Sequence, residues 1–367
     1  MTAAVDSMRV VFRVDASIDI GTGHVMRCLT LADALSSNGA ECHFISRDLH
    51  GNLIEQTRFR GYTVHVLPAP DDRTNLAQEP PHASWLGVDW LTDADESSSV
   101  LRDLNPEWLV LDHYALDSCW EKATRQHWKR LFVIDDLADR THIADVLLDQ
   151  NLGRQVSDYK SLLPEHAHCL VGPQYALLRP EFAELRPYNL MRREDGELRH
   201  LLISLGGVDK DNATGAVLRA LQDCPLPEDC TITVVMGGHS PHLDDVQAIA
   251  STMAWPTEVA ININDMAKRM TEADLAIGAA GSSSWERCCL GLPTLILILA
   301  ENQKQIAYAM DASGAALTLG DPTQLDKLPV RWESLTQSHV LAQVSKTARS
   351  VTAGDGSEIV YELMRKI

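Results

Sequence analysis

The chain has 367 residues, a formal net charge of −19 and 45% hydrophobic residues, so it can bury a large core and favours two domains over one. The acidic balance disfavours nucleic acid and anionic membranes as partners, but a small anionic substrate stays open because local amides and a few arginines decide its binding. No apolar run reaches the ~20 residues of a membrane span, no signal-peptide pattern opens the sequence, and eight scattered cysteines without a C-x-x-C pair predict a cytoplasmic protein that binds no metal.

In the first half of the chain, short apolar runs alternate with stretches of helical periodicity, which is typical of a parallel sheet covered on both faces. Strands are expected near residues 8–14, 41–46, 62–67, 107–111, 130–134, 145–149 and 168–172. Helices are expected near residues 23–37, 52–60, 93–104 and 117–127. The proline- and aspartate-rich stretch 68–84 is predicted to be a mobile surface loop.

The first strand leads into a glycine turn that carries a histidine, Gly21-x-Gly23-His24, and a helical pattern follows directly. Such a turn points backbone amides and a helix dipole at a ligand, which favours an anion. A histidine there can exchange protons near neutral pH, and Arg13 and Asp15 at the end of the strand could orient or charge it. The competing interpretation is a histidine with a structural role only.

Acidic residues also occur farther along the first half. Asp112 and Tyr114 close the strand at 107–111, where the tyrosine hydroxyl could hold a sugar hydroxyl or a water. Asp93 and Asp95 form a D-x-D pair that could bind a metal ion, but they lie in an acidic, serine-rich stretch. We expect that stretch to open a helix instead.

The second half repeats the alternating architecture without repeating the sequence. Strands are expected near residues 200–205, 231–236, 258–263, 274–278, 293–298 and 315–319. The fold class is therefore α/β, with two doubly wound, Rossmann-like domains that face each other across a cleft where ligands bind. The expected boundaries are 1–175 for the first domain, 176–199 for a charged, proline-containing connection, 200–330 for the second domain and 331–367 for C-terminal helices.

Two glycine turns in the second half could bind phosphate. One ends at Gly207, after the strand at 200–205. In the other, Ser282 and Ser283 open a helix that carries Glu286, so amides and hydroxyls could hold a diphosphate while the carboxylate accepts from a ribose. The alternative is a plain helix start, with Ser282 as its N-cap.

Several common motifs are absent from the sequence. The first glycine turn is not G-x-G-x-x-G, because Met26 takes the position of the third glycine. Neither G-x-x-x-x-G-K-[ST] nor G-x-S-x-G occurs, so a P-loop and a serine-hydrolase triad are not expected.

Motifs spread over residues 8–310 resemble the family of UDP-sugar hydrolases that act in pseudaminic acid biosynthesis. The matching segments are Arg13 to Ser17 with Gly21-x-Gly23-His24-x-x-Arg27-Cys28, Trp108 to Asp117, Ile134 to Arg140, Leu147 to Asn151, Gly172 to Phe182, and Glu301-Asn302-Gln303. So many long matches in one order argue against chance. The loop at 68–84 and the last ~30 residues carry no family signal.

The resemblance implies the GT-B arrangement, similar to the two-domain glycosyltransferases of peptidoglycan lipid synthesis, with UDP held by the second domain and the base supplied by the first. By this resemblance, His24 is expected to be the catalytic base, Tyr114 and Asn302 to be residues of the sugar or water site, and Glu286 to be the ribose contact. The residues expected to bind the substrate, from the turns and the resemblance together, are Arg13, Asp15, Gly21, Gly23, Arg27, Arg179, Gly207, Ser282, Ser283, Glu286 and Gln303.

The implied reaction is hydrolysis of a UDP-linked 2,4-diacetamido-2,4,6-trideoxy hexose, without metal or other cofactor, by water that attacks the anomeric carbon with inversion. One base can suffice, because a phosphate-type oxygen with a second pKa near ~6 leaves as an anion, whereas ordinary glycoside hydrolysis uses two carboxylates. Helix N-termini and turn amides can stabilise the growing charge. The expected partner is this small-molecule substrate, with no nucleic acid or membrane, and a monomer is the default.

Three other interpretations stay open at this point. A glycosyltransferase that uses a UDP-sugar donor could share the fold, because fold does not determine function. A nucleotide-sugar binding protein without turnover and a hydrolysing 2-epimerase are the other two. The sequence alone identifies neither the sugar nor whether the C–O or the P–O bond breaks.

Overall fold

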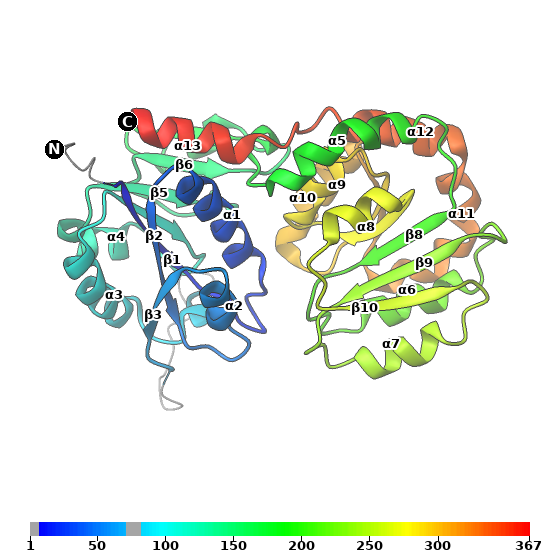
Figure 1. Ribbon diagram of the computed structural model, residues 1–367, viewed down its shortest axis with the longest axis horizontal. Helices are drawn as coiled ribbons and strands as arrows, with labels where there is room; N and C mark the ends of the chain where they lie inside the picture. The colour runs from blue at the N-terminus through cyan, green and yellow to red at the C-terminus, as the bar shows by residue number, and fades with distance from the viewer. Residues whose placement is uncertain (1–6, 71–81) are drawn as a thin grey trace. The chain divides into compact units, whose positions relative to one another are not determined.

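The computed structural model describes residues 7–70 and 82–367, which form two α/β units (Figure 1). The first unit extends to Leu177 and also includes Ser357–Ile367, and the second unit is Leu178–Gly356. Each unit is built on one parallel sheet, as the alternating pattern predicts.

The sheet of the first unit has the strand order β3-β2-β1-β4-β5-β6-β7. Its strands are β1 (Arg9–Val14), β2 (Glu41–Arg47), β3 (Thr63–Leu67), β4 (Trp108–Asp112), β5 (Arg130–Ile134), β6 (Val146–Asp149) and β7 (His168–Val171). Its α-helices are α1 (Gly23–Ser37), α2 (Ile54–Phe59), α3 (Trp90–Leu104), α4 (Ser118–Thr124) and α13 (Gly356–Lys366). Short 3-10 helices are η1 (Ala83–Leu86), η2 (Arg125–His127), η3 (Val156–Tyr159) and η4 (Pro173–Tyr175).

Helices cover both faces of this sheet because its strands are apolar on both sides. Phe12 of β1 packs in a buried cluster with α1 and with Val360 of α13. Val11, the preceding residue, packs in a different cluster with Leu101 of α3 and Trp120 of α4. Alternate residues of one strand therefore enter different cores, which is the pattern of a buried parallel strand.

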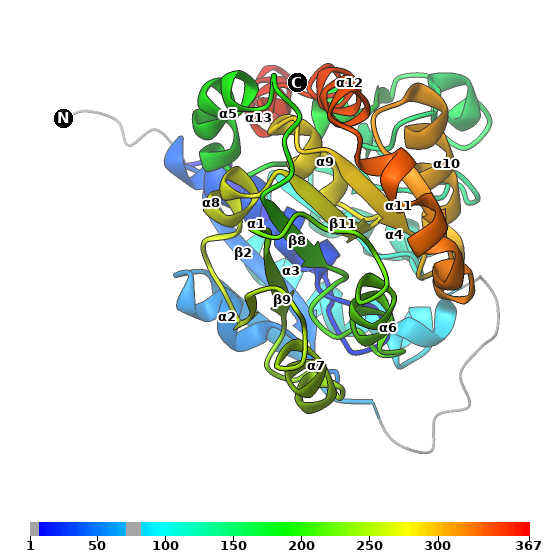
Figure 2. The same ribbon diagram turned by 90° about the vertical axis from the view of Figure 1, so that its right-hand side faces the viewer.

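The second unit has a sheet with the strand order β10-β9-β8-β11-β12-β13. The strands are β8 (His200–Ser204), β9 (Thr231–Met236), β10 (Thr257–Ile261), β11 (Leu275–Ala279), β12 (Thr294–Leu297) and β13 (Leu317–Gly320). The helices are α5 (Pro180–Arg192), α6 (Ala213–Leu221), α7 (Leu243–Ala250), α8 (Met266–Glu272), α9 (Ser283–Cys289), η5 (Glu301–Gln303), α10 (Lys304–Ser313), η6 (Pro322–Lys327), α11 (Leu328–Thr336) and α12 (Ser338–Ala348). Helices lie on both faces of this sheet as well (Figure 2).

All thirteen predicted strands are confirmed, with shifts of a residue or two at their ends. One helix begins earlier than expected, because Asp89 caps α3 by accepting from the amides of Leu91 and Thr92. Asp93 therefore lies inside the first turn of α3, where its side chain is buried, instead of opening the helix. Of the predicted loop at 68–84, residues 71–81 lie outside the described residues.

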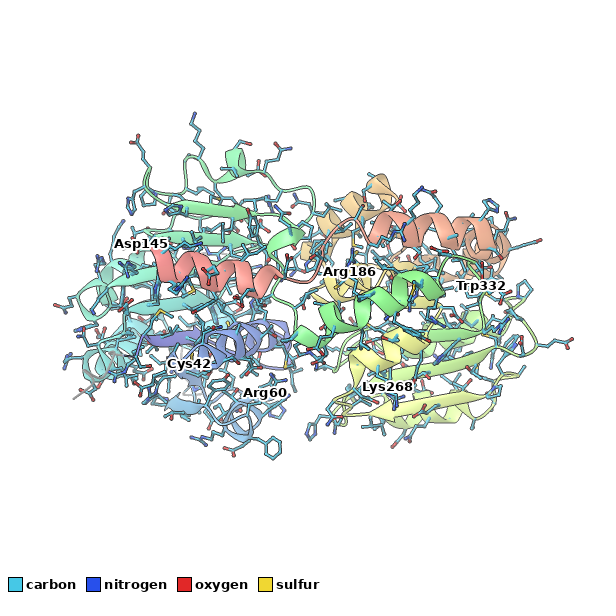
Figure 3. The ribbon with its side chains drawn as sticks, turned by 45° about the horizontal axis from the view of Figure 1, so that its top comes forward. Cys42, Arg60, Asp145, Arg186, Lys268 and Trp332 are labelled. Carbon is cyan, nitrogen blue, oxygen red and sulfur yellow. The ribbon has the colours of Figure 1, made fainter. Side chains whose placement is uncertain are left out.

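The chain passes from the first unit to the second between Leu177 and Leu178, inside the expected connection at 176–199. Most of that segment is not a linker, however, but the helix α5 of the second unit, which corrects its expected extent. Three arginines of α5 and its C-terminal end fasten it there. Arg186, labelled in Figure 3, donates to the carbonyl oxygens of Cys289 and Arg349. Arg192 pairs with Asp274 at 2.5 Å. Arg193 is almost fully buried and donates to four carbonyl oxygens, those of Met270, Thr271, Ala273 and Leu290.

The C-terminal helices expected at 331–367 do not form one group. Helices α11 and α12 belong to the second unit, where Trp332 and Leu341 enter the core. Helix α13 belongs to the first unit, where Val360 and Met364 are buried against the sheet. Helix α13 packs on the first sheet instead of joining α11 and α12, because its apolar stripe, with Val360 and Met364, fills the core of the first unit.

Candidate active site

His24 lies in the first turn of α1, directly after the predicted glycine turn. Gly21 has a φ of +80°, a conformation that favours glycine, and its amide donates to the carbonyl oxygen of Ser17 at 2.8 Å. Helix α1 begins at Gly23, so the next residue projects from the helix start. The His24 side chain is 11% exposed, which leaves part of the ring open to a small molecule.

Asp112 and Arg27 hold the His24 ring in place. Asp112 ends β4, which pairs with β1 in the sheet, so the carboxylate arrives at the edge where the turn after β1 begins. Its Oδ1 lies 2.6 Å from His24 Nδ1. Arg27, one turn along α1, donates to both oxygens of Asp112 at 2.6 and 2.7 Å.

The charge of Asp112 fixes which nitrogen of His24 is available. Burial alone would raise the pKa of Asp112, but the Arg27 guanidinium and the His24 ring outweigh it and hold this pKa below its ordinary value. An ionised carboxylate only accepts hydrogen bonds, so the neutral ring donates from Nδ1. Nε2 is then the unprotonated nitrogen, which is the form a general base requires.

Tyr114 packs against His24 but uses its hydroxyl for a protein contact. The two rings meet edge to face, with centroids 4.6 Å apart. The Tyr114 hydroxyl donates to Asp136 at 2.7 Å, and Asp136 also pairs with Arg27 and accepts from Asn151. Burial and the Asp136 charge raise the pKa of Tyr114, so it stays a neutral phenol whose oxygen can still accept.

Arg13 and Asp15 do not orient His24, which corrects the expectation drawn from their position at the end of the first strand. Both side chains are fully buried. Arg13 pairs with Asp15 at 2.8 Å and with Asp93 at 2.5 Å, and Asp93 also accepts from Arg47. The structure therefore gives these two side chains a role in the core and no surface for substrate contact. The acidic D-x-D stretch contributes to this network through Asp93.

Asp112 is the main residue that sequence reasoning missed as a partner of His24. The sequence places it at a strand end, but 88 residues separate the two. Only the strand order, with β1 beside β4, brings them together.

In the second unit, the two predicted glycine turns have open backbones. A Cβ at Gly207 or at Gly281 would meet nothing within 4 Å. Ser282 is exposed and makes no capping hydrogen bond to the helix, which removes the N-cap interpretation of its side chain. The Ser283 hydroxyl accepts from Arg287 at 3.0 Å.

Glu286 and Arg179 approach each other in the same unit. Their closest oxygen and nitrogen are 4.0 Å apart, and Arg179 also pairs with Glu181 at 2.8 Å. Burial raises the pKa of Glu286, and the charges of Arg179 and Arg287 partly offset that effect. A partly desolvated carboxylate with weak pairing is suited to accept hydrogen bonds from hydroxyls.

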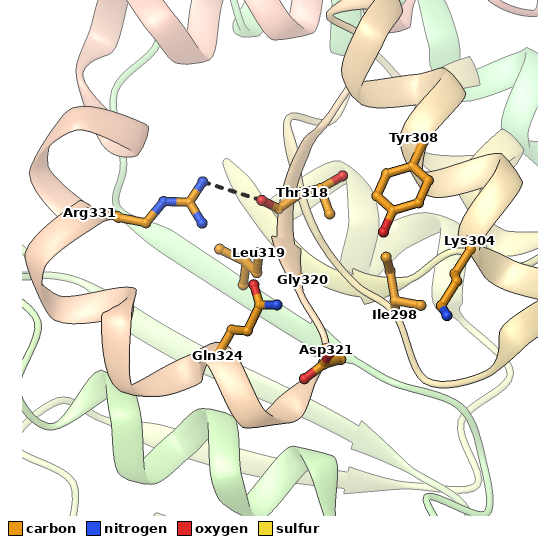
Figure 4. Close-up of a pocket in the computed structure, with 9 residues that line it drawn as sticks. All are labelled: Ile298, Lys304, Tyr308, Thr318, Leu319, Gly320, Asp321, Gln324 and Arg331. Atoms are coloured by element: carbon orange, nitrogen blue, oxygen red, sulfur yellow. Dashed lines mark hydrogen bonds between the residues drawn. The ribbon is translucent and has the colours of Figure 1, made fainter.

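Asn302 and Gln303 lie in η5, before α10. Asn302 is exposed, while the Gln303 side chain accepts from the Leu299 amide at 3.0 Å and so holds the turn itself. A hollow of about 190 Å³ adjoins this region (Figure 4). Lys304 and Tyr308 line it from α10, but none of the predicted site residues does.

The predicted residues thus form separate groups. His24, Arg27 and Tyr114 come together in the first unit, and Arg179 and Glu286 approach each other in the second. Within residues 7–70 and 82–367, no three or more His, Cys, Asp or Glu side chains are arranged to hold a metal ion. No helix in that part of the chain has the length and apolar character needed to cross a bilayer. All eight cysteines are free thiols.

No known protein-family profile matches the chain. The UDP-2,4-diacetamido-2,4,6-trideoxy-beta-L-altropyranose hydrolase of Campylobacter jejuni is 26% identical over 312 residues, which cover 85% of this chain and 96% of that protein. The spore coat polysaccharide biosynthesis protein SpsG of Bacillus subtilis is 35% identical over 149 residues, 41% of this chain and 43% of SpsG. An uncharacterized protein of Methanocaldococcus jannaschii is 25% identical over 303 residues, 81% of this chain and 57% of that protein.

The chain therefore spans about half the length of the last two relatives and nearly all of the first. The resemblance found in the motifs is confirmed, because the chain is a homologue of the C. jejuni hydrolase and of SpsG.

Solved structures confirm the fold class. MurG of Acinetobacter baumannii superposes with a TM-score of 0.69 at 17% identity, over 98% of this chain and 100% of MurG. TcCGT1, solved in complex with UDP, gives a TM-score of 0.63 at 12% identity, over 98% of this chain and 100% of that one. At these identities the likeness establishes the GT-B type of fold, with its two parallel-sheet α/β units, and nothing about activity.

Proposed function

We propose that this protein hydrolyses a UDP-linked 2,4-diacetamido-2,4,6-trideoxy hexose to UDP and the free sugar. The observation that carries the proposal is the contact between His24 Nδ1 and the Asp112 carboxylate, which leaves Nε2 as a base at a partly open position. The name and nearly full-length match of the C. jejuni relative supply the substrate class.

In the proposed reaction, His24 Nε2 takes a proton from water while the water oxygen bonds to the anomeric carbon. The bond from that carbon to the β-phosphate oxygen breaks, and UDP leaves with the electron pair, so the anomeric configuration inverts. Asp112 is a positioning residue that stabilises the imidazolium once it forms, as the third member of a catalytic triad does. Arg27 keeps Asp112 ionised throughout.

The second unit is proposed to bind UDP. Glu286 would accept from the ribose hydroxyls, and the open turns at Gly207 and Gly281 would offer amides to the diphosphate. Arg179 lies close enough to Glu286 to add a positive charge near the same nucleotide. The exposed Ser282 hydroxyl is a further donor.

Two further residues complete the proposed sugar and water contacts. Tyr114 keeps one acceptor position on its oxygen, because its proton is donated to Asp136. Asn302 presents an exposed amide that can donate and accept. Gln303 supports the turn that carries Asn302.

We also propose that the enzyme acts without a metal, as a monomer in the cytoplasm. Departure of UDP as an anion removes the need for a Lewis acid. Eight free thiols fit a reducing compartment. Light scattering during gel filtration measures the oligomeric state, and activity after treatment with EDTA measures the need for metal.

Incubation with UDP-2,4-diacetamido-2,4,6-trideoxy-β-L-altropyranose in ¹⁸O water, without any acceptor, tests the proposed function. We expect UDP and a free sugar that carries the label and keeps its configuration at C2. Label in UDP would mean attack at phosphorus, and a changed C2 would mean an epimerase. Turnover only after addition of an acceptor would mean a glycosyltransferase.

A further inference from the structure

Three aromatic side chains surround His24 on one side. Tyr114 and Trp85 lie nearly parallel, 22° apart in plane, with centroids at 5.5 Å. His82 packs against both of them, at 4.4 Å from Trp85 and 5.4 Å from Tyr114. The His24 ring meets Trp85 edge to face at 6.4 Å. We call His82, Trp85 and Tyr114 the aromatic wall.

The aromatic wall is held firmly although two of its members are only partly buried. Trp85 lies in η1, and the next residue, Leu86, is buried in the core between the sheet and α3. Gly87 follows with a φ of +76°, at a place where a Cβ would collide with the ring of Pro70. The wall is thus fixed by its neighbours in the fold.

His82 adopts a backbone conformation that suggests a function. Its φ of +70° lies in the left-handed region, which non-glycine residues adopt uncommonly, with histidine, asparagine and aspartate found there more often than most. Such conformations persist where the surroundings enforce them and often occur at functional sites. Burial, together with the nearby Arg140 charge, lowers the pKa of His82, so its ring is neutral at neutral pH and offers an apolar face.

We propose that Trp85, supported by His82, is a specificity-determining residue that packs on the apolar groups of the sugar, its acetamido methyls and the 6-methyl. This inference rests on the proposed function. A base that acts at the anomeric carbon has the sugar beside its ring, and the aromatic wall is the partly exposed apolar surface next to that ring. Aromatic faces bind C–H groups well and discriminate against hydroxyls that would lose water there.

The position of Trp85 sets it apart from the residues that the motifs identified. It follows the 68–84 stretch, in which the sequence showed no family signal. The proposal therefore predicts that sugar selectivity resides partly in a segment outside the shared motifs.

The test compares UDP-sugar affinity with UDP affinity by calorimetry in a His24→Asn background, so that no turnover occurs during the titration. We expect Trp85→Ala to weaken binding of UDP-2,4-diacetamido-2,4,6-trideoxy-β-L-altropyranose about tenfold and to leave UDP affinity unchanged. Trp85→Phe should restore most of the loss. Trp85→Gln keeps a long side chain without a ring and serves where Trp85→Ala does not fold. The matched control is Trp90→Ala, because Trp90 is 39% exposed at the start of α3 and outside the wall.

Turnover of the enzyme with native His24 is measured in parallel, so that the proposed hydrolysis and the proposed role of Trp85 can be refuted independently of each other. Turnover with equal UDP-sugar affinity in the Trp85→Ala and Trp90→Ala variants would overturn the role of Trp85 and leave the hydrolase intact. Loss of sugar-dependent affinity in Trp85→Ala, without turnover in the native enzyme, would support the wall and refute hydrolysis. UDP-sugar affinity no better than that of UDP in the His24→Asn protein that keeps Trp85 would also overturn the role of Trp85.

Discussion

Buried arginines are bound differently in the two units. In the first unit they meet carboxylates: Arg13 pairs with Asp15 and Asp93, and Arg27 pairs with Asp112. All of these side chains are at least nine-tenths buried. Charge in this core is therefore neutralised by direct contact, and two hydrogen bonds each fix the Arg13–Asp93 and Arg27–Asp112 pairs.

In the second unit, the buried Arg193 and Arg287 donate to oxygens that carry no full charge. Arg193 bonds to carbonyl groups and the Asn189 side chain, and Arg287 bonds to the Ala279 carbonyl and two serine hydroxyls. Among the described residues neither makes a salt bridge, and burial lowers the pKa of Arg193 to about 9 and that of Arg287 to about 10.

The difference in how buried arginines are bound suggests that the two units have different roles. Paired charge holds a general base in one orientation, whereas positive charge without a paired carboxylate favours an incoming anion. Arg287 donates to Ser283, in the turn proposed to meet the diphosphate of UDP.

The largest effect is expected from His24→Asn. This change should lower kcat by roughly 10²–10⁴-fold, because it removes the general base, while UDP affinity stays nearly the same. Steady-state kinetics and calorimetry measure the two quantities. His166→Asn is the control, since His166 is 66% exposed in the same unit. A His24→Asn enzyme with native turnover would make His24 a structural residue.

Replacement of one buried arginine in each unit by methionine tests the contrast directly. Arg13→Met leaves Asp15 and Asp93 with less compensation and should cost about 3–5 kcal/mol of unfolding free energy. Arg193→Met leaves neutral carbonyl groups unsatisfied and should cost less, about 1–3 kcal/mol. Urea unfolding followed by tryptophan fluorescence measures both, with allowance for two transitions. Equal costs, or the reverse order, would contradict the contrast.

Asp149 is a buried carboxyl of the first unit whose ion pair with Arg154, at 3.0 Å, does not offset its burial. Burial, and next the charge of Asp136, raises its pKa from 3.8 to about 7. The folded state therefore keeps a proton that the unfolded state loses, so this group makes stability fall as the pH rises from about 4 to about 7. Asp149→Asn should remove that fall, worth up to about 4 kcal/mol.

The unfolding free energy measured at pH 5 and at pH 7 gives its slope against pH for the native protein and for the Asp149→Asn variant. The exposed Asp103→Asn is the control. An unchanged slope in the Asp149→Asn variant would show that this carboxyl is ionised throughout.

The smallest effect is expected from Glu286→Ala in the second unit. Loss of one charge-assisted contact should weaken UDP binding by about 1–3 kcal/mol, and kcat should change little. Glu228→Ala, an exposed position in the same unit, is the control. Unchanged UDP affinity by calorimetry would remove Glu286 from the proposed ribose contact.

The sequence predicted features that depend on neighbouring residues. The strands followed from apolar runs, and the place of His24 followed from the glycine turn before it. Its partner Asp112 did not follow, because their contact depends on which strands lie side by side.

Other features could not be predicted, because the same sequence pattern is compatible with a linker or loop and with an ordered element. The charges around Arg193 are typical of a linker, yet that guanidinium fastens α5 to the second unit through carbonyl groups that no sequence pattern marks. Trp85 was hidden similarly, since it directly follows a stretch predicted to be a mobile loop.

Helix α13 has a consequence for how the chain folds during synthesis. Val360 and Met364 fill the core of the first unit, although every residue of the second unit is translated before them. On the ribosome, the second unit can finish folding while the first still lacks α13, the helix that completes its core. A stalled or clipped product that ends near residue 356 would therefore expose apolar surface on its earlier half, and chaperones or proteases would find that half first.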